Sequence, residues 1–133
     1  MKLFISYKFT GEKIEDLELA LKNICSSLEK AGHVCFCSLW HEEHFQKNNF
    51  THKQILDYAL KELDQADTCL AYIKSSEKSE GMLIETGYAM AKNKKIYIAI
   101  NKEVKSVFMR EIADELIEFE NLEELCLKLE NLK

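Results

Sequence analysis

The chain has 133 residues, of which 47% are hydrophobic and 31% charged, and its formal net charge at pH 7 is -5. This length and composition predict a single globular domain spanning residues 1–133, and an acidic balance without a basic block disfavours a site for a nucleic acid polymer. The start MKLFISYKF lacks the features of a signal peptide, and every apolar run is far shorter than the roughly 20 residues that cross a bilayer. We therefore expect a cytoplasmic protein without a membrane partner.

The first half of the chain shows strand-like and helical patterns in turn. Residues 2–7 form a short apolar run that predicts a strand, and residues 33–39 predict a second strand. The polar segment 40–50 predicts a loop of about ten residues, longer than most α/β connections, and long loops often carry function. A helix between the two strands is predicted by apolar residues at helical spacing, which are Ile14, Leu17, Leu21, Ile24 and Leu28.

The second half continues the same alternation. Thr51 and Gln54 form a capping-box pattern that begins a helix ending near Asp67. Residues 68–73 are nearly all apolar and predict a central strand. We then expect a helix from residue 81 or 82 to 92, a strand at 94–100, an edge strand at 115–120, and a last helix from 121 to 132.

Strands and helices that alternate through one domain predict an α/β fold, because parallel strands need crossover connections. We expect a doubly wound, five-stranded parallel sheet of flavodoxin-like or Rossmann-like type with strand order 2-1-3-4-5. Ligands in such sheets bind beyond the carboxyl ends of the strands, here between the first and third strands. The loops expected there are 6–13, 40–50 and 74–82.

The five cysteines are an odd number without a C-x-x-C pair, which predicts reduced and mostly buried thiols. Cys35 and Cys37 share one face of a predicted strand, with three histidines nearby, His33, His41 and His44. Their spacing is not that of an ordinary zinc site. We therefore expect neither a metal site nor a cofactor.

Glu85 is an acid among apolar and small residues. The positions three or four residues away are Gly81, Met82, Tyr88 and Ala89, so its side of the helix is not a charged surface. In one interpretation Glu85 complements the helix dipole from a solvated face. In the other, the dipole at the first helical turn keeps Glu85 ionised as a nucleophile or anchor, worth roughly 0.3–1 kcal/mol.

The segment SEGMLIETGYAMAKNKKIYIAI, residues 79–100, resembles the nucleoside 2-deoxyribosyltransferase superfamily, which includes the 2′-deoxynucleoside 5′-monophosphate N-glycosidases. The family pattern of Gly, Glu, one residue and Gly falls on Gly81, Glu85 and Gly87, and the resemblance extends over residues 3–100. It implies cleavage or transfer of an N-glycosidic bond, with Glu85 attacking C1′ of the sugar in a relative of retaining glycoside hydrolysis. It also implies a small-molecule nucleoside or nucleotide as partner, and a homo-oligomer, a dimer or larger.

Other candidate residues lie on the predicted loops. Ser6 and Tyr7 end the first strand, where the Tyr7 hydroxyl could bond the sugar or the nucleophile, or else cap the core. Ser79, Gly81 and Met82 precede Glu85 and are candidates for substrate binding, because helix N-termini bind phosphate. Trp40, the only tryptophan, is a candidate for stacking on the base.

One position departs from the family pattern. Family enzymes usually carry an acid before the third strand as proton donor or sugar-orienting group, and here Ala59 occupies that position. Asp57 is two residues away, which turns a helix by about 200°, so it does not simply substitute. The alternatives are Glu42 or Glu43, an acid from a neighbouring chain, or a different reaction.

A second resemblance is to TIR domains, through LFISY at residues 3–7 and Ser79 six residues before Glu85. It implies either cleavage of the nicotinamide glycosidic bond of NAD or a non-catalytic interaction module. The tryptophan found near this segment in many TIR domains is absent here. We therefore favour the deoxyribosyltransferase interpretation.

Overall fold

The computed structural model describes residues 1–133 and contains one five-stranded, all-parallel sheet. The strand order is β2-β1-β3-β4-β5, which confirms the predicted fold class and topology, including the last strand at an edge. The strands are β1 (Lys2–Tyr7), β2 (Val34–Phe36), β3 (Thr68–Ile73), β4 (Lys95–Asn101) and β5 (Glu115–Phe119).

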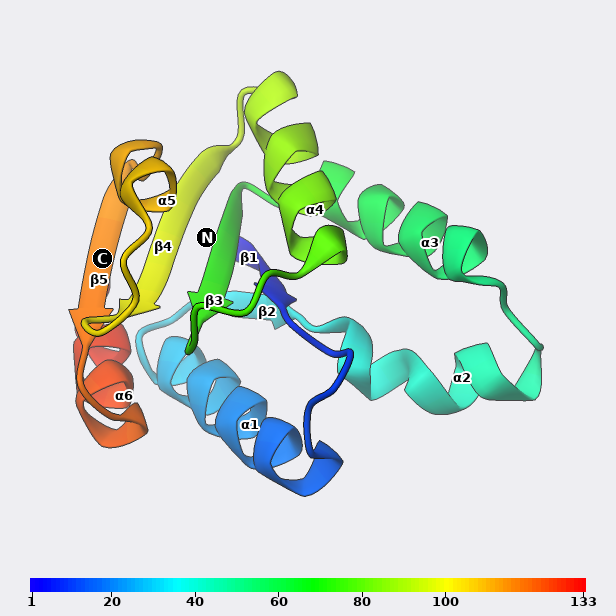
Figure 1. Ribbon diagram of the computed structural model, residues 1–133, viewed down its shortest axis with the longest axis horizontal. Helices are drawn as coiled ribbons and strands as arrows, with labels where there is room; N and C mark the ends of the chain where they lie inside the picture. The colour runs from blue at the N-terminus through cyan, green and yellow to red at the C-terminus, as the bar shows by residue number, and fades with distance from the viewer.

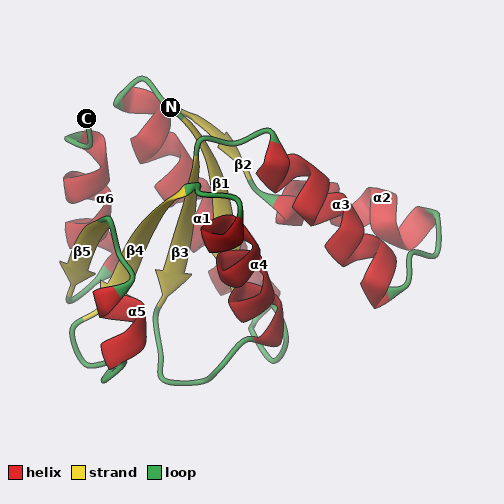
Figure 2. Cartoon of the chain, turned by 90° about the horizontal axis from the view of Figure 1, so that it is seen from above, coloured by secondary structure: helices red, strands yellow, loops and turns green.

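Helices cover both faces of the sheet (Figure 1). One face carries α1 (Ile14–Lys30) and α6 (Leu122–Glu130). The other carries α3 (His52–Asp64), α4 (Glu80–Ala91) and the short α5 (Val107–Glu111). A 3-10 helix, η1 (Ser38–His41), and α2 (Glu42–Lys47) extend beyond the β2 edge (Figure 2). None of the helices is long and apolar enough to cross a membrane.

The two core layers follow from the alternation of side chains along the buried strands. In β1, Leu3 and Ile5 face α1 and α6, whereas Phe4 packs in the layer of α3 and α4. Ser6 follows Phe4 by two residues and therefore points under α4, where it is fully buried. A hydroxyl placed there needs a hydrogen-bond partner, and this requirement leads to the candidate site.

The prediction of a loop at residues 40–50 is wrong, because η1 and α2 occupy most of this segment. β2 ends at Phe36, and η1 and α2 follow it almost without interruption. Phe45, on α2, is buried and stacks on Phe50 at 5.3 Å between ring centroids, with Tyr58 of α3 edge-on at 5.2 Å. The aromatic residues that looked like scattered loop residues thus anchor α2 against α3.

Side-chain N-caps set where α3 and α4 begin. At α3 the predicted box is confirmed, since the Thr51 hydroxyl accepts from the Gln54 N–H and Gln54 Oε1 accepts from the Thr51 N–H. At α4 the N-cap is Ser79, whose hydroxyl accepts from the Met82 N–H at 3.2 Å. The helix therefore begins at Glu80, before the predicted start.

α5 was not predicted from the sequence. It has only five residues, and none of them is buried. Arg110 holds the segment in place through hydrogen bonds to the Ser106 and Asn101 carbonyls and an ion pair with Glu118 at 3.2 Å. These contacts are too local and too polar to leave an apolar period in the sequence.

His33 joins the two ends of the chain. Its Nδ1 lies 3.0 Å from the amino group of Met1, and its Nε2 lies 2.9 Å from the carbonyl oxygen of Leu132. The first and last residues accordingly lie on the same side of the molecule, opposite the carboxyl ends of the strands (Figure 2).

Candidate active site

Glu85 of α4 reaches the end of β1. The Ser6 hydroxyl donates a hydrogen bond of 2.6 Å to Glu85 Oε1 and so satisfies the buried serine. Burial raises the pKa of Glu85 from its ordinary value of 4.5 to about 7, although the Ser6 hydrogen bond acts in the opposite direction. The carboxyl group is therefore divided between its neutral and charged forms near neutral pH.

The prediction that the helix dipole at the first turn keeps Glu85 ionised is wrong. Because Ser79 caps the helix, Glu85 is the sixth residue of α4 and lies in its second turn, beyond the free N–H groups of the first. Desolvation dominates at this depth, and it favours the protonated acid. The ionisation of Glu85 therefore depends on how far its surroundings keep water from the carboxyl group.

Tyr7 lies next to this pair but bonds a different residue. Its hydroxyl is 2.9 Å from Ser38 Oγ of η1, whereas Glu85 is bonded by Ser6. The pKa of Tyr7 is raised, mainly by burial and further by the nearby Cys37, Glu85 and Glu42. Tyr7 therefore stays protonated and can donate a hydrogen bond. Glu85 of α4 and Glu42 of α2 thus both raise the pKa of the Tyr7 hydroxyl.

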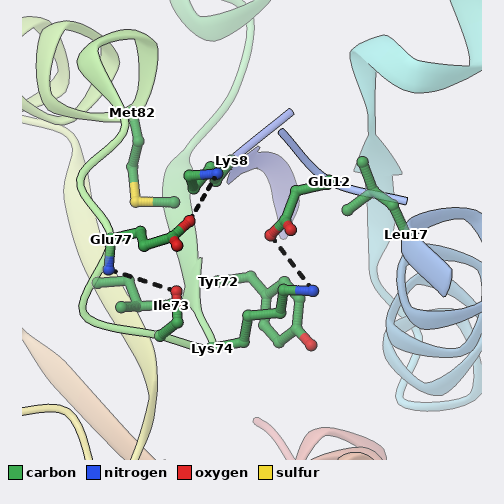
Figure 3. A pocket seen from close by; sticks show the side chains of 9 residues that line it. Lys8, Glu12, Leu17, Tyr72, Ile73, Lys74, Glu77 and Met82 are labelled. Carbon is green, nitrogen blue, oxygen red and sulfur yellow. Dashed lines mark hydrogen bonds and ion pairs between the residues drawn. The ribbon is translucent and has the colours of Figure 1, made fainter. Parts of the chain in front are cut away.

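A recess opens at the carboxyl ends of β1 and β3 (Figure 3). Ser6, Tyr7 and Glu85 do not line it, but Lys8, which follows Tyr7, does. The enclosed volume of the recess is about 20 Å³, which is room for about one water molecule, and it reaches about 320 Å³ only when the open space at its mouth is included. Met82, which precedes Glu85 by one helical turn, points into it (Figure 3). Its lining residues are Lys8, Glu12, Leu17, Tyr72, Ile73, Lys74, Ser75, Glu77 and Met82.

Two ion pairs line the recess (Figure 3). Lys8 pairs with Glu77 at 3.2 Å, and Lys74 pairs with Glu12 at 3.2 Å, so each pair joins the loop after β1 to the loop after β3. The Lys8 side chain is only 15% exposed, so its charge is partly shielded from water. Sequence reasoning found these loops but not the pairs, because a charged residue in a loop gives no sign of its partner.

The remaining predicted site residues are dispersed. Ser79 lies at the cap of α4, and its hydroxyl accepts a backbone hydrogen bond. Gly81 is exposed in the first turn, and a side chain there would contact nothing within 4 Å. Trp40 is 48% exposed on η1 and does not line the recess; its indole lies beside the thiol of Cys25. The structure therefore brings together Ser6, Tyr7, Met82 and Glu85, and leaves Trp40 apart.

The candidate acids differ in their surroundings. Ala59, at the position of the family acid, is buried in the core of the α3 and α4 layer. Asp57 is exposed and paired with Lys53 at 2.9 Å, and Glu43 is exposed. Glu42 is half-buried at the start of α2 and close enough to raise the pKa of Tyr7. No group of three or more His, Cys, Asp or Glu side chains is placed to hold a metal ion.

Two solved structures share this fold. The CMP N-glycosidase BcmB of Clostridium botulinum matches with a TM-score of 0.64 and 19% identity, over 97% of this chain and 97% of that one. The 2-deoxyribosyltransferase of Bacillus psychrosaccharolyticus matches with a TM-score of 0.65 and 18% identity, over 100% of this chain and 93% of that one. A comparison with curated protein sequences gives no match.

The sequence itself matches a family model. The model describes nucleoside 2-deoxyribosyltransferases and covers residues 8–124, a range that includes both recess loops, Glu85 and β5. This agrees with the first of the two resemblances, and it covers most of the chain rather than the motif alone. The chain belongs to the nucleoside 2-deoxyribosyltransferase family.

Proposed function

We propose that this enzyme breaks the N-glycosidic bond of a 2′-deoxynucleoside 5′-monophosphate, with Glu85 as the nucleophile. Family membership supports the reaction class, which is cleavage or transfer of an N-glycosidic bond of a nucleoside or nucleotide. One observation carries the role of Glu85: a carboxyl group with a pKa near 7, hydrogen-bonded to Ser6 beside a recess at the ligand-binding edge of the sheet.

The proposed reaction has two steps. The Glu85 carboxylate attacks C1′, a bond forms between them, and the bond from C1′ to the base nitrogen breaks. The base leaves with the electron pair of that bond and takes up a proton from an acid. Water, or a second base, then attacks C1′, gives a proton to the acid that was deprotonated in the first step, and displaces Glu85, which returns as a carboxylate. In this proposal the Tyr7 hydroxyl, protonated throughout, donates a hydrogen bond to the sugar.

Glu42 is the proposed proton donor. Among the candidate acids it alone combines partial burial with proximity to Tyr7 and hence to the nucleophile. Asp57 is engaged with Lys53, and Glu43 faces solvent. General acid help of this kind contributes typically 10²–10⁴-fold, so about that much activity depends on the donor.

The recess supports a monophosphate rather than a free nucleoside. Lys8, Lys74 and Ser75 line the recess and carry hydrogen-bond donors that suit a phosphate, and Met82 in the first turn of α4 lines it as well. An anionic ligand would take over the lysines from Glu12 and Glu77, with which they pair in its absence. One of the structural neighbours, the CMP N-glycosidase, is named for a nucleotide substrate.

Base release separates the possible substrates. The purified protein is incubated with deoxynucleosides, their 5′-monophosphates, CMP and NAD, and free base is quantified by chromatography. We expect release from a deoxynucleoside monophosphate, loss of release in Glu85→Gln, and a large decrease in Glu42→Gln but not in Glu43→Gln. Addition of a second base distinguishes transfer from hydrolysis. Release from NAD alone, or full activity in Glu85→Gln, contradicts the proposal.

Two further features belong to the same proposal. The five free cysteines fit a reducing, cytoplasmic location. A homo-oligomer is also proposed, as the family resemblance implies.

A further inference from the structure

Three of the five free cysteines meet between α1 and β2. Cys35 lies on β2, and Cys37 follows in extended backbone just before η1, so both side chains point to the same side of the strand. That side faces α1, which packs against β2 (Figure 1). Cys25 of α1 is buried in the same apolar layer as Cys37, and Cys35 packs against that layer. One thiol on the helix therefore faces two thiols on the strand.

The three thiols differ in their exposure to solvent. Cys25 is 7% exposed and Cys37 only 1%, whereas Cys35 is partly exposed, on a strand at the edge of the sheet. The other two cysteines lie on other elements: Cys69 of β3 is buried in the opposite layer, and Cys126 of α6 is partly exposed. A small oxidant therefore reaches the three-thiol cluster at Cys35, with Cys25 directly behind it.

The arrangement favours a charged sulfur on Cys25. The neighbouring thiols of Cys35 and Cys37 lower the pKa of Cys25, because they can donate hydrogen bonds to its sulfur, and the Trp40 indole acts in the same direction against the effect of burial. The pKa values of Cys35 and Cys37 are raised, first by the same contacts with Cys25 and then by burial. The thiolate is the form that attacks a peroxide, and a neighbouring thiol then supplies the second sulfur of a disulfide.

We propose that Cys25 and Cys35 form a reversible disulfide when the protein meets a hydroperoxide. The Cys25 thiolate attacks one oxygen of hydrogen peroxide, the O–O bond breaks, and the second oxygen leaves as hydroxide and takes up a proton to become water. The Cys35 sulfur then attacks the sulfenic sulfur of Cys25, an S–S bond forms, and hydroxide leaves with the Cys35 proton as a second water. Two thiols are thus oxidised by two electrons while one peroxide is reduced to two waters.

Cys37 remains a thiol in this reaction, because it is the most deeply buried of the three and has no access to solvent of its own. A dithiol reductant reverses the bridge by thiol–disulfide exchange, so the protein is reduced under ordinary cytoplasmic conditions. The inference does not rest on the proposed reaction at Glu85, and the disulfide is measured without any nucleotide.

Thiol counting tests the site on the full chain. The protein is treated with hydrogen peroxide, denatured and titrated for free thiols, and we expect the five thiols of the parent to fall by two, to three, and to return with dithiothreitol. Peptide mapping after trypsin should join residues 23–30, which carry Cys25, to residues 31–47. Five thiols after peroxide, or a bridge between two chains on a non-reducing gel, overturns the proposal.

Single variants identify the pair. Cys25→Ala and Cys35→Ala each begin with four thiols and should keep all four, whereas Cys37→Ala should still lose two. Cys126→Ala is the matched control, since it removes a partly exposed cysteine from another helix, and it should also lose two. Loss of two thiols in Cys25→Ala or Cys35→Ala, or protection by either of the other two substitutions, overturns the assignment. The peptide map of the parent needs no variant, so it decides the matter even where a buried alanine lowers stability.

Trp40 gives an independent readout. It is the only tryptophan, and its indole lies beside the thiol of Cys25. A disulfide quenches the fluorescence of an adjacent indole more strongly than a thiol does, so peroxide should lower the emission of the parent and dithiothreitol should restore it. Cys25→Ala should show no such reversible change. Unchanged Trp40 emission in a parent that has lost two thiols places the bridge elsewhere and overturns the proposal.

Discussion

At Glu85, burial and the Ser6 hydroxyl act in opposite directions on the same proton. Burial has the larger effect, so the folded protein binds this proton more tightly than the unfolded chain does. A nucleophile must be ionised, and a carboxylate that is poorly solvated is more reactive than one in water. Keeping such a carboxylate out of water lowers the free energy of unfolding, and this loss of stability can be measured.

Glu85→Gln should therefore stabilise the protein at alkaline pH. The pKa rises from 4.5 in the unfolded chain to about 7 in the fold, so the parent loses stability as pH rises between these values. The loss is complete above pH 7 and amounts to roughly 3 kcal/mol. Urea unfolding should show the variant more stable at pH 8, with the advantage vanishing below pH 4.5. Asp57→Asn, at an exposed ion pair, is the control and should show no such gain.

Ser6→Ala should move the pH profile of base release. The Ser6 hydrogen bond lowers the pKa of Glu85, so removing it raises that pKa further above 7. The acid side of the kcat/KM profile reports ionisation of the free enzyme and should shift to higher pH. Ser38→Ala is the control, since Ser38 contacts Tyr7 and not Glu85. Equal profiles for parent and Ser6→Ala would count against Glu85 as the titrating group.

At the scale of the elements, two helix caps offer a matched comparison. Thr51 caps α3 and Ser79 caps α4, and each accepts a hydrogen bond from the third residue of its helix. Replacing either by alanine should cost about 1 kcal/mol of unfolding free energy.

The two cap variants should differ in activity. α4 carries Glu85 and Met82, and its first turn adjoins the recess, whereas α3 contributes no lining residue. Ser79→Ala should therefore lower kcat/KM, and Thr51→Ala should leave it near the parent value at temperatures where both are folded. Denaturation and base release are measured on the same samples. Equal losses of activity in both variants would mean that only global stability matters.

Sequence reasoning located long, periodic elements well and short ones poorly. The capping box at Thr51 and the apolar run of β3 are local signals, and both were predicted with almost the observed bounds. α2 was missed because its burial depends on Phe45 meeting Phe50 and Tyr58, contacts that only the fold creates. The start of α4 was placed too late because Gly81 looked like a helix boundary, whereas the Ser79 hydroxyl sets it.

At the scale of the whole molecule, the strand order followed from the alternation of elements, since parallel strands allow few connections. The same order predicted that Ser6, Tyr7 and Glu85 would meet, although 79 residues separate Ser6 from Glu85. It could not predict that Ser6 rather than Tyr7 bonds the carboxyl group. That choice depends on which side of β1 each residue faces relative to α4 and on the exact height of α4 above the sheet.

His33 has a consequence for how the chain can be connected. Because one imidazole ring contacts both the first residue and Leu132, a short Gly/Ser linker can join the two ends without crossing the molecule. New ends can be opened between Asn48 and Asn49, in an exposed turn between α2 and α3. Such a circular permutant should fold, as circular dichroism and base release would show, while the same permutant with His33→Ala should be less stable. A folded permutant would show that the arrangement of the elements in space does not require their present order along the chain.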